Sequence, residues 1–228
     1  MNQQFTLFNL DKRHYLPKYG NMPELICSNM PPTLVSLLLN PGKSKRSYPD
    51  IGAWAGERLV CVGDLMKQYP TGVLTAKEEA EVREYAEGKE DEDGGNLYHF
   101  ARHAFTQAPP PSVNTDQFAG GQQVWVLRNL SKRVYVRADV LAGKPEAMGP
   151  FVEPLGFGDL LLANITWSTD SVKMDYGHVL VLGPWAGDRF DIVPWDVAKK
   201  DIKKEKKAWK DVSEEQAKRT RMLLADLF

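Results

Sequence analysis

Gly183-Pro184-Trp185-Ala186-Gly187-Asp188-Arg189-Phe190 has a close copy earlier in the chain, Gly52-Ala53-Trp54-Ala55-Gly56-Glu57-Arg58-Leu59. A second pair occurs in the same order, because Asn9-Leu10-Asp11-Lys12-Arg13-His14-Tyr15-Leu16 matches Asn129-Leu130-Ser131-Lys132-Arg133-Val134-Tyr135-Val136. We call the first pair the Trp motifs and the second pair the Asn-Leu motifs. Two matches in the same order predict an internal duplication, and therefore two similar lobes joined in one body.

The length and composition suit such a body. The chain has 228 residues, of which 43% are hydrophobic and 26% charged, as in an ordinary globular protein. We expect a first lobe over 1–107, a linker over 108–121 and a second lobe over 122–228 with a helical C-terminal extension. The linker is predicted from its prolines at one end and its glycines at the other.

Strands are predicted from runs of β-branched and aromatic residues and from short apolar runs. The expected strands cover 5–10, 14–16, 58–64, 124–127, 160–165, 179–182 and 189–193. The last two strands form a hairpin around the turn 183–187.

Helices are expected over 33–39, 76–87, 97–105 and 199–210, and from Ser213 onward. Capping boxes at Thr75 to Glu78 and at Ser213 to Gln216 mark two of these starts. The predicted fold class is α+β, with two pseudosymmetric lobes of mostly antiparallel strands, helices on the outside and a C-terminal helix.

The charge pattern bears on the partners. Residues 1–120 carry 12 basic and 15 acidic side chains (−3), and residues 121–228 carry 17 and 15 (+2). Neither half has the excess of cations that a dedicated nucleic-acid binder needs to displace counterions, so nucleic acid is not an expected partner. No apolar run approaches the roughly 20 residues that span a bilayer, so no membrane partner is expected.

The cysteines and the N-terminus indicate the compartment. Cys27 and Cys61 are the two cysteines, and both lie in apolar surroundings that favour free thiols. The first residues lack the basic and apolar regions of a secretory signal. We therefore expect a reducing, cytoplasmic location.

The Trp motifs have two interpretations. In the structural one, the glycines permit a tight turn, the Trp anchors the end of a sheet, and the acid beside the Arg holds the loop. In the functional one, Arg58 and Arg189 bind a carboxylate or phosphate in a cleft shared by the lobes, while Trp54 and Trp185 stack on a flat ligand. Lys12, Arg13, Lys132 and Arg133 then either extend this cleft as a cationic rim or form solvated turns.

The sequence gives weaker evidence for a catalytic site than for a binding site. Asp64, Asp188 and Asp191 are the carboxylates nearest the Trp motifs, and Asp64 and Asp188 are the acid/base candidates if the chain is an enzyme. His99 and His103 have the i, i+4 spacing of metal ligands, but no third ligand is evident, so no metal is expected. Gly156-Phe157-Gly158 does not match a phosphate-binding loop. The sequence implies no particular cofactor.

The Trp motifs and the Asn-Leu motifs together resemble a group of uncharacterised proteins predicted from fungal genomes. The resemblance spans most of the chain and implies an intracellular fungal origin, but it assigns no catalytic residue.

Three functional hypotheses follow. The first is a non-catalytic binding or interaction module that holds a small anionic ligand or a protein partner, with a ligand cleft between the lobes. The alternative is a small enzyme, a hydrolase or transferase, that acts on an anionic or flat ligand. The third is an interaction protein that uses the Lys-rich segment 199–210, which is otherwise a solvated helix face.

Overall fold

A computed structural model describes residues 3–17, 20–40, 51–66, 71–87, 96–108, 124–143, 154–167, 183–205 and 208–225. The helices are α1 (Met22–Ile26), α2 (Met30–Leu38), α3 (Ala76–Glu87), α4 (Leu97–Ala104), α6 (Ala138–Leu141), α7 (Phe157–Ile165), α8 (Trp195–Lys204) and α9 (Ser213–Ala225). The strands are β1 (Phe5–Asn9), β2 (His14–Tyr15), β3 (Leu59–Gly63), β4 (Thr106–Gln107), β5 (Trp125–Asn129), β6 (Val134–Arg137), β7 (Thr166–Trp167), β8 (Phe190–Pro194) and β9 (Lys210–Asp211). The α+β class and the C-terminal helix are confirmed.

The strands form two sheets of closely related connectivity. Sheet A has the order β4-β2-β1-β3-β7, and sheet B has the order β8-β5-β6-β9. In both sheets an antiparallel hairpin built from the Asn-Leu motif pairs with the strand that follows the Trp motif, and a short parallel strand extends the hairpin. Asn9 is opposite Leu59 in sheet A, and Asn129 is opposite Phe190 in sheet B.

The two Asn-Leu motifs make the same turn. The Asn9 side-chain oxygen accepts a hydrogen bond from the Lys12 amide at 2.9 Å, and Asn129 accepts from the Lys132 amide at 2.9 Å. Arg13 and Arg133 adopt positive φ values of 53° and 56°. Asn therefore supplies the side-chain bond that holds this turn in each copy.

The two Trp motifs meet each other in antiparallel fashion. Arg58 and Arg189 face each other in a β-bridge. The amide of Gly56 donates to the Phe190 carbonyl at 2.7 Å, and the amide of Gly187 donates to the Leu59 carbonyl at 2.7 Å. Gly56 and Gly187 have φ values of 88° and 79°, where a side chain would strain the backbone. The repeated stretch thus forms a contact between the two halves.

Backbone pairing also joins the two halves at two other places. Strand β7, from the second half, pairs in parallel with β3 of the first half. Leu39, which follows α2 in the first half, forms a parallel bridge with Ile192 in β8. The second half therefore adds a strand to sheet A, and the first half reaches sheet B through a single bridge.

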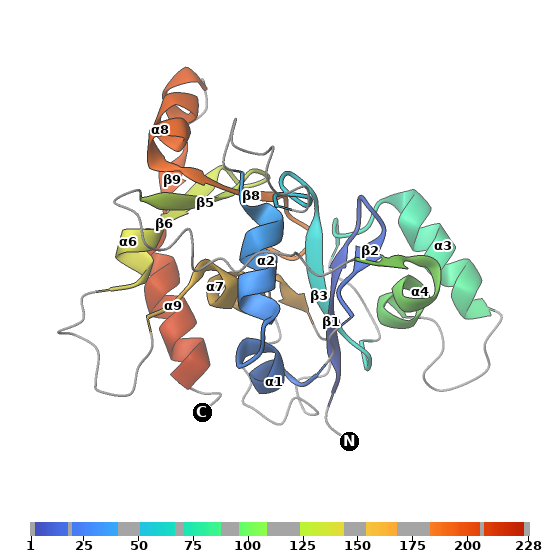
Figure 1. Cartoon of the computed structure of the whole chain (residues 1–228). Coiled ribbons are helices and arrows are strands. Elements are labelled where there is room, and N and C mark those ends of the chain that lie inside the picture. The colour runs from blue at the N-terminus through green and yellow to red at the C-terminus, as the bar shows by residue number, and fades with distance from the viewer. Residues whose placement is uncertain are drawn as a thin grey trace.

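Helices α2 and α7 lie between the two sheets, in a core cluster that also contains Leu7 and Cys61 from sheet A and Leu127 and Ile192 from sheet B. Figure 1 shows them at the centre of the molecule. The predicted strand over 160–165 is wrong, because this segment is the C-terminal part of α7. All nine residues of α7 except Asp159 are buried, and a short apolar run does not distinguish a buried strand from a buried helix.

Helices α3, α4 and α8 lie outside the sheets, as the sequence predicts. Helices α3 and α4 cover the outer face of sheet A, where Val82 and Phe100 pack with Val60 and Val62. Helix α8 covers the outer face of sheet B, where Ala198 packs with Val126 and Val193. Helix α9 packs against α6 and α7. The arrangement is therefore layered, with helices outside each sheet and two helices between the sheets (Figure 1).

Several predictions lie outside the described residues. They are the linker beyond Ala108 and the strand over 179–182. The second strand of that predicted hairpin is present as β8, which pairs with β5 in sheet B. In the part of the chain that the structure describes, no helix is both long and apolar enough to cross a membrane.

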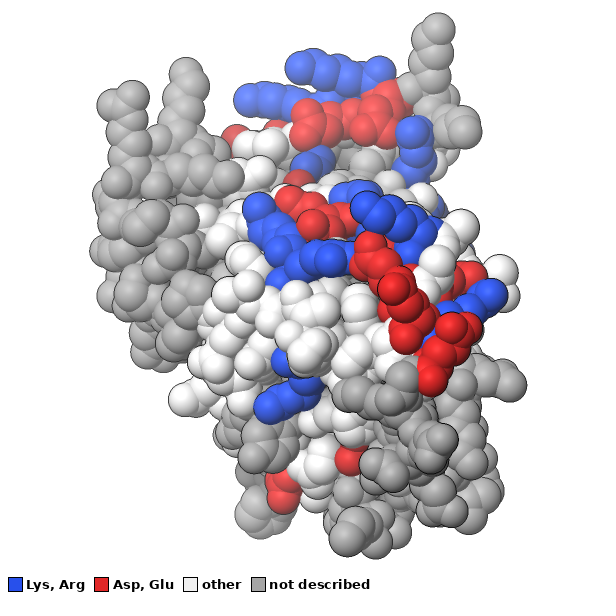
Figure 2. All heavy atoms as spheres, turned by 90° about the vertical axis from the view of Figure 1, so that its right-hand side faces the viewer, with Lys and Arg blue, Asp and Glu red and all other residues white. Residues whose placement is uncertain are grey.

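Charged side chains of both signs gather on one face of the molecule. Figure 2 shows blue and red side chains next to each other across the middle of this face, and a group of acidic side chains toward one edge. The cations are thus interspersed with anions rather than collected into one large basic surface.

Candidate functional site

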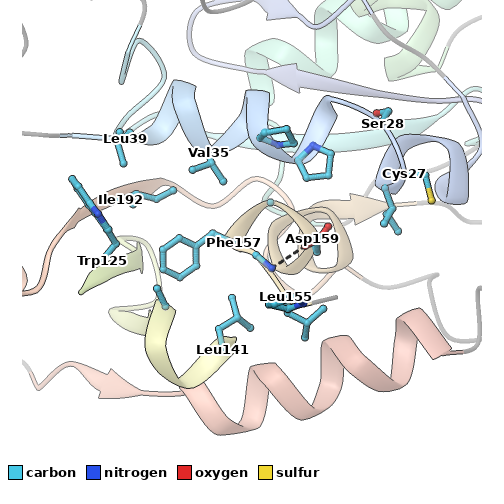
Figure 3. Close-up of a pocket in the computed structure, with 17 residues that line it drawn as sticks. Cys27, Ser28, Val35, Leu39, Trp125, Leu141, Leu155, Phe157, Asp159 and Ile192 are labelled. Atoms are coloured by element: carbon cyan, nitrogen blue, oxygen red, sulfur yellow. Dashed lines mark hydrogen bonds between the residues drawn. The ribbon is translucent and has the colours of Figure 1, made fainter. Parts of the chain in front are cut away.

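A pocket of about 590 Å³ lies between the two halves of the chain. Figure 3 shows α2 above it, with Val35 and Leu39 pointing down, and Trp125, Phe157 and Leu141 below it. The first half contributes α1, α2 and the turn between them, and the second half contributes β5, α6, β8 and the start of α7. The volume falls within the roughly 300–1,000 Å³ typical of small-molecule sites.

The lining is largely apolar. Its described aliphatic and aromatic side chains include Val35, Leu39, Trp125, Leu141 and Phe157. Asp159 is the one charged residue among the described residues that line the pocket, and the set contains no Lys, Arg or His. Such a surface favours an uncharged, apolar ligand, because an anion here would face a carboxylate and would lack a cationic partner.

The start of α7 fixes one wall of the pocket. A Cβ atom at Gly158 would lie 2.4 Å from the Pro31 carbonyl oxygen, so only glycine permits this contact between α7 and α2. The Asp159 carboxylate accepts a hydrogen bond from the Gly156 amide at 2.9 Å and thereby caps the helix (Figure 3). The Gly156-Phe157-Gly158 stretch is therefore a packing signal rather than a phosphate loop.

Two polar residues lie at the α1 end. The Ser28 hydroxyl donates to the Leu25 carbonyl at 2.7 Å and accepts from the Met30 amide at 3.0 Å, which starts α2. Cys27 is a free, exposed thiol, whereas Cys61 is free and buried. Burial raises the pKa of the Cys61 thiol to about 12. The accessible thiol is therefore Cys27, beside the pocket.

The two tryptophans of the Trp motifs do not line the pocket. Trp54 is 1% exposed and Trp185 is 4% exposed, and both belong to the central core cluster. Their indole rings have no free face on which a flat ligand could stack. This geometry agrees with the structural interpretation of the motifs, in which Trp anchors the turn.

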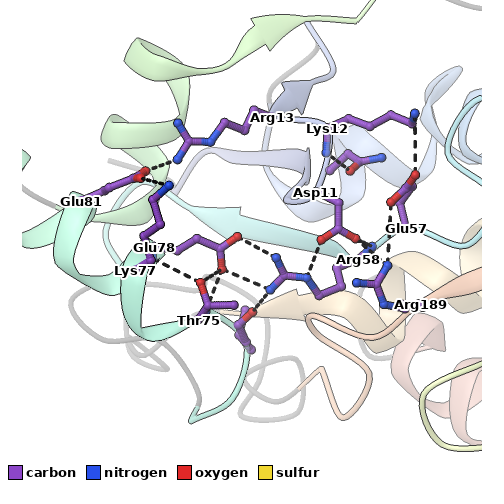
Figure 4. A network of polar contacts seen from close by, with 12 residues as sticks. Asp11, Lys12, Arg13, Glu57, Arg58, Thr75, Lys77, Glu78, Glu81 and Arg189 are labelled. Carbon is purple, nitrogen blue, oxygen red and sulfur yellow. Dashed lines mark hydrogen bonds and ion pairs between the residues drawn. The ribbon is translucent and has the colours of Figure 1, made fainter.

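The structure brings Arg58 and Arg189 together, but both are paired. Arg58 donates from Nε to Asp11 at 2.8 Å and from Nη2 to Glu78 at 2.6 Å, and its Nη1 donates to Glu78 and to the Val73 carbonyl at 3.1 Å. Figure 4 shows the guanidinium between these carboxylates. All three of its nitrogens are used within the protein, so Arg58 has no nitrogen left without a protein acceptor.

Arg189 occupies the equivalent place in the second Trp motif. Its Nη1 donates to Asp11 at 2.7 Å and to the Gly56 carbonyl at 2.9 Å, and lies 3.8 Å from Glu57 (Figure 4). The side chain is 44% exposed, against 15% for Arg58. The pair forms a junction between the halves rather than an open anion site.

The pKa shifts of Asp11 and Glu78 are consistent with ion pairing at this junction. Burial raises the pKa of Asp11, but hydrogen bonds from the Arg58 amide and guanidinium outweigh burial, so the pKa is lowered overall. The pKa of Glu78 is lowered in the same way, since bonds from Arg58 and Thr75 outweigh its burial. Both carboxylates are therefore held in the charged form by their partners.

The cations of the Asn-Leu motifs are also paired. Lys12 lies 3.6 Å from Glu57, and Arg13 contacts Glu81. Lys132 lies 3.3 Å from Asp188, and Arg133 lies 3.2 Å from Glu205. A cationic rim is not formed, because each of these side chains has an acidic neighbour.

The acid/base candidates are separated from the pocket. Asp64 accepts a hydrogen bond from the Gln4 amide at 3.0 Å beyond the end of β3. Asp188 accepts from the Asn129 side chain at 2.8 Å, and burial raises its pKa. Asp191 is bound to Arg128 at 2.7 Å and 2.8 Å. None of the three carboxylates lines the pocket.

Among the described residues, no group of three or more His, Cys, Asp or Glu side chains is arranged to hold a metal ion. His99 and His103 lie on α4, where their rings contact Tyr98 and Tyr85 with centroids 5.2 Å and 5.3 Å apart. No protein-family model, curated protein or solved structure matches the chain.

Proposed function

We propose that this chain is a non-catalytic binding protein whose ligand is a small, uncharged and largely apolar molecule. The observation that carries the proposal is the pocket of about 590 Å³ between the two halves, with one carboxylate and no cation among its described lining residues. A cleft between duplicated halves is part of the sequence-based hypothesis. Its residues differ from those predicted, because the two tryptophans and two arginines are used by the fold.

Binding is favoured over catalysis for a specific reason. The described polar side chains of the pocket are Cys27, Ser28, Trp125 and Asp159. The hydroxyl of Ser28 and the carboxylate of Asp159 cap the starts of helices. The described lining contains no His, and its one carboxylate is used as a helix cap, so neither Ser28 nor Cys27 has a general base there. The enzyme alternative with Asp64 or Asp188 would require a second site.

The intracellular fungal setting remains part of this proposal. It is supported by the free thiols of Cys27 and Cys61 and by the resemblance described above.

Two matched fluorescent probes test the proposal. N-phenyl-1-naphthylamine is neutral, and 8-anilino-1-naphthalenesulfonate is its sulfonated analogue. We expect the neutral probe to bind and to raise the melting temperature. At 100 times its dissociation constant it should add about 2.7 kcal/mol to the free energy of unfolding. We expect the sulfonated probe to bind at least about tenfold more weakly, because its charge would be buried beside Asp159 without a cation.

A pocket-filling variant locates the bound probe. Ala138→Phe places a ring in the pocket at the start of α6, and Val35→Phe does so from α2. Ala80→Phe is the matched control, because Ala80 is exposed on α3 at the far side of sheet A. Loss of binding in the two pocket variants, with folded spectra, supports the proposal. Equal binding of both probes by all three variants would rule it out.

A further inference from the structure

The exposed side of α8 carries four lysines that have no ion pair among the described residues. They are Lys199, Lys200, Lys203 and Lys204, and each is exposed. The cations of the Asn-Leu and Trp motifs differ, since each of those has an acidic partner. Helix α8 therefore carries four exposed lysines without an acidic partner among the described residues, which makes it a cationic helix face.

Helix α8 is fixed so that this side faces outward. Ala198 is fully buried against sheet B, and Ile202 packs beside it. Asp201 accepts a hydrogen bond from Nη1 of Arg128 at 2.9 Å, which ties the same side of the helix to β5. At 100° per residue, the four lysines occupy an arc of about 140° opposite Ala198.

The position of α8 makes the lysines accessible. Figure 1 places α8 at one extremity of the molecule, beyond sheet B. Figure 2 shows Lys and Arg side chains that extend outward at the top of the molecule, where Figure 1 shows α8. Lys203 and Lys204 lie in the last turn, where cations stabilise a helix through its dipole. Lys199 and Lys200 lie before that turn, so this effect does not account for them.

We propose that this lysine face of α8 is a docking surface for a short acidic segment of a partner protein. The lysines form two rows with i, i+4 spacing, and carboxylates at the same spacing on a facing helix would match them. Asp196, exposed in the first turn of α8, limits the cationic face to about two turns. The complementary segment is therefore short, with about four acidic residues.

A nucleic acid fits this surface less well. Single strands are bound by long cationic grooves together with aromatic rings on which bases stack. The aromatic residue of α8, Trp195, is packed against Tyr135 with ring centroids 5.7 Å apart and against Arg137. The whole chain also has a formal net charge of −1.

Fluorescence anisotropy at low ionic strength tests the proposal with labelled hexaglutamate as the probe. The test variant replaces the four α8 lysines by Gln. The matched control replaces Lys12, Lys77, Lys132 and Lys210 by Gln, which removes the same charge from lysines that are paired within the protein. We expect the α8 variant to bind about tenfold more weakly than the wild type, because four exposed ion pairs are lost.

The control variant should lose less affinity for hexaglutamate than the α8 variant does. Added salt should weaken the binding of hexaglutamate to the wild type, because it screens exposed charges. A labelled hexathymidylate serves as a second probe and should bind more weakly than hexaglutamate. The proposal is overturned if the control variant loses as much affinity as the α8 variant, or if hexathymidylate binds the wild type as well as hexaglutamate does. Wild-type binding no tighter than that of the α8 variant would also overturn it.

Discussion

Asp11 Oδ2 accepts a hydrogen bond from Nη1 of Arg189 at 2.7 Å, although the two residues are 178 positions apart in sequence. The same carboxylate accepts from the Nε and the amide of Arg58, both at 2.8 Å. One acid thus binds the arginines of both Trp motifs. The equivalent residue in the second Asn-Leu motif is Ser131, whose hydroxyl accepts only from the Arg189 amide at 2.9 Å.

This asymmetry predicts unequal effects of two matched substitutions. Asp11→Ala should lower the free energy of unfolding by about 2 kcal/mol, because hydrogen bonds to a charged group are lost and Arg58 keeps only Glu78 as an ionic partner. Ser131→Ala should cost about 1 kcal/mol or less, since one neutral bond is lost. Urea denaturation of both variants measures the difference, and equal costs would contradict the bridging role of Asp11.

The two arginines should also differ from each other. Arg58→Ala leaves Asp11 and Glu78 without their main partner in a site where the Arg58 side chain is 15% exposed. A loss of about 2–3 kcal/mol is expected. Arg189→Ala removes a side chain that is 44% exposed and should cost about 1 kcal/mol. Melting temperatures of the two variants, with and without the neutral probe, separate this structural role from ligand binding. Probe affinity should be unchanged in both.

Acid should weaken the junction. Asp11 and Glu78 have folded pKa values below their ordinary values of 3.8 and 4.5. An acid with a lowered folded pKa stabilises the fold above its unfolded pKa, and this contribution is lost as the pH falls through the folded pKa. The free energy of unfolding should therefore begin to fall near pH 4.5 and continue to fall below pH 3.8.

The double variant Asp11→Asn, Glu78→Gln provides the comparison for this pH dependence. It should be less stable at pH 7 and should show a flatter acid profile, because the two titrating groups are absent. Asp188 affects the pH dependence in the opposite direction. Because burial raises its folded pKa, its titration favours the folded state as the pH falls. Asp188→Asn should accordingly retain the acid loss seen in the wild type. A double variant with the wild-type acid profile would show that other carboxylates dominate.

The thiols provide a test of the pocket wall. Cys61 is fully buried with a pKa of about 12, whereas Cys27 is exposed. A chromogenic disulfide reagent at pH 8 should modify one thiol in the folded protein and both after unfolding, because the thiolate is the reactive form. Cys27→Ser should abolish the native reaction. The neutral probe should slow it, since Cys27 borders the pocket; rapid labelling of two thiols in the folded state would contradict the burial of Cys61.

Local patterns in the sequence predicted the local structure well. The capping box at Thr75 is present, with the Thr75 amide donating to Glu78 at 2.7 Å and the Glu78 amide donating to the Thr75 hydroxyl at 3.3 Å. Asn96 caps α4 as expected. These signals lie within four residues of each other, so the interactions that they report do not depend on the rest of the fold.

Long-range features could not be found in this way. The segment predicted as a strand over 160–165 is the C-terminal part of α7, a helix buried between two sheets whose residues come from distant parts of the chain. The pocket combines Val35, Trp125 and Phe157, which are far apart in sequence and have no shared pattern. The ion pairs of Arg58 and Arg189 depend on Asp11 and Glu78, whose positions no spacing rule connects. The same residues therefore suggested an open anion site.

In sheet B, loss of the buried Arg128–Asp191 pair should lower stability more than loss of the more exposed Arg128–Asp201 pair. Arg128 donates to Asp191 at 2.7 Å and 2.8 Å, and both side chains are 9% exposed, whereas its other partner Asp201 is 41% exposed. Asp191→Ala should cost about 3 kcal/mol, because the guanidinium stays buried and keeps only the exposed carboxylate of Asp201 among the described residues. Asp201→Ala should cost about 1 kcal/mol, as an exposed pair is screened by water.

A double replacement separates the cost of an unpaired charge from the value of the pair itself. Arg128→Met with Asp191→Leu removes both charges and keeps apolar volume between sheet B and α8. It should be more stable than Asp191→Ala alone, since replacing both members of a buried pair is often nearly neutral. Urea denaturation of the three variants measures these differences. If the double variant is no more stable than Asp191→Ala, then the loss comes from packing around Trp209, whose ring lies 5.7 Å from the Arg128 guanidinium, rather than from the buried charge.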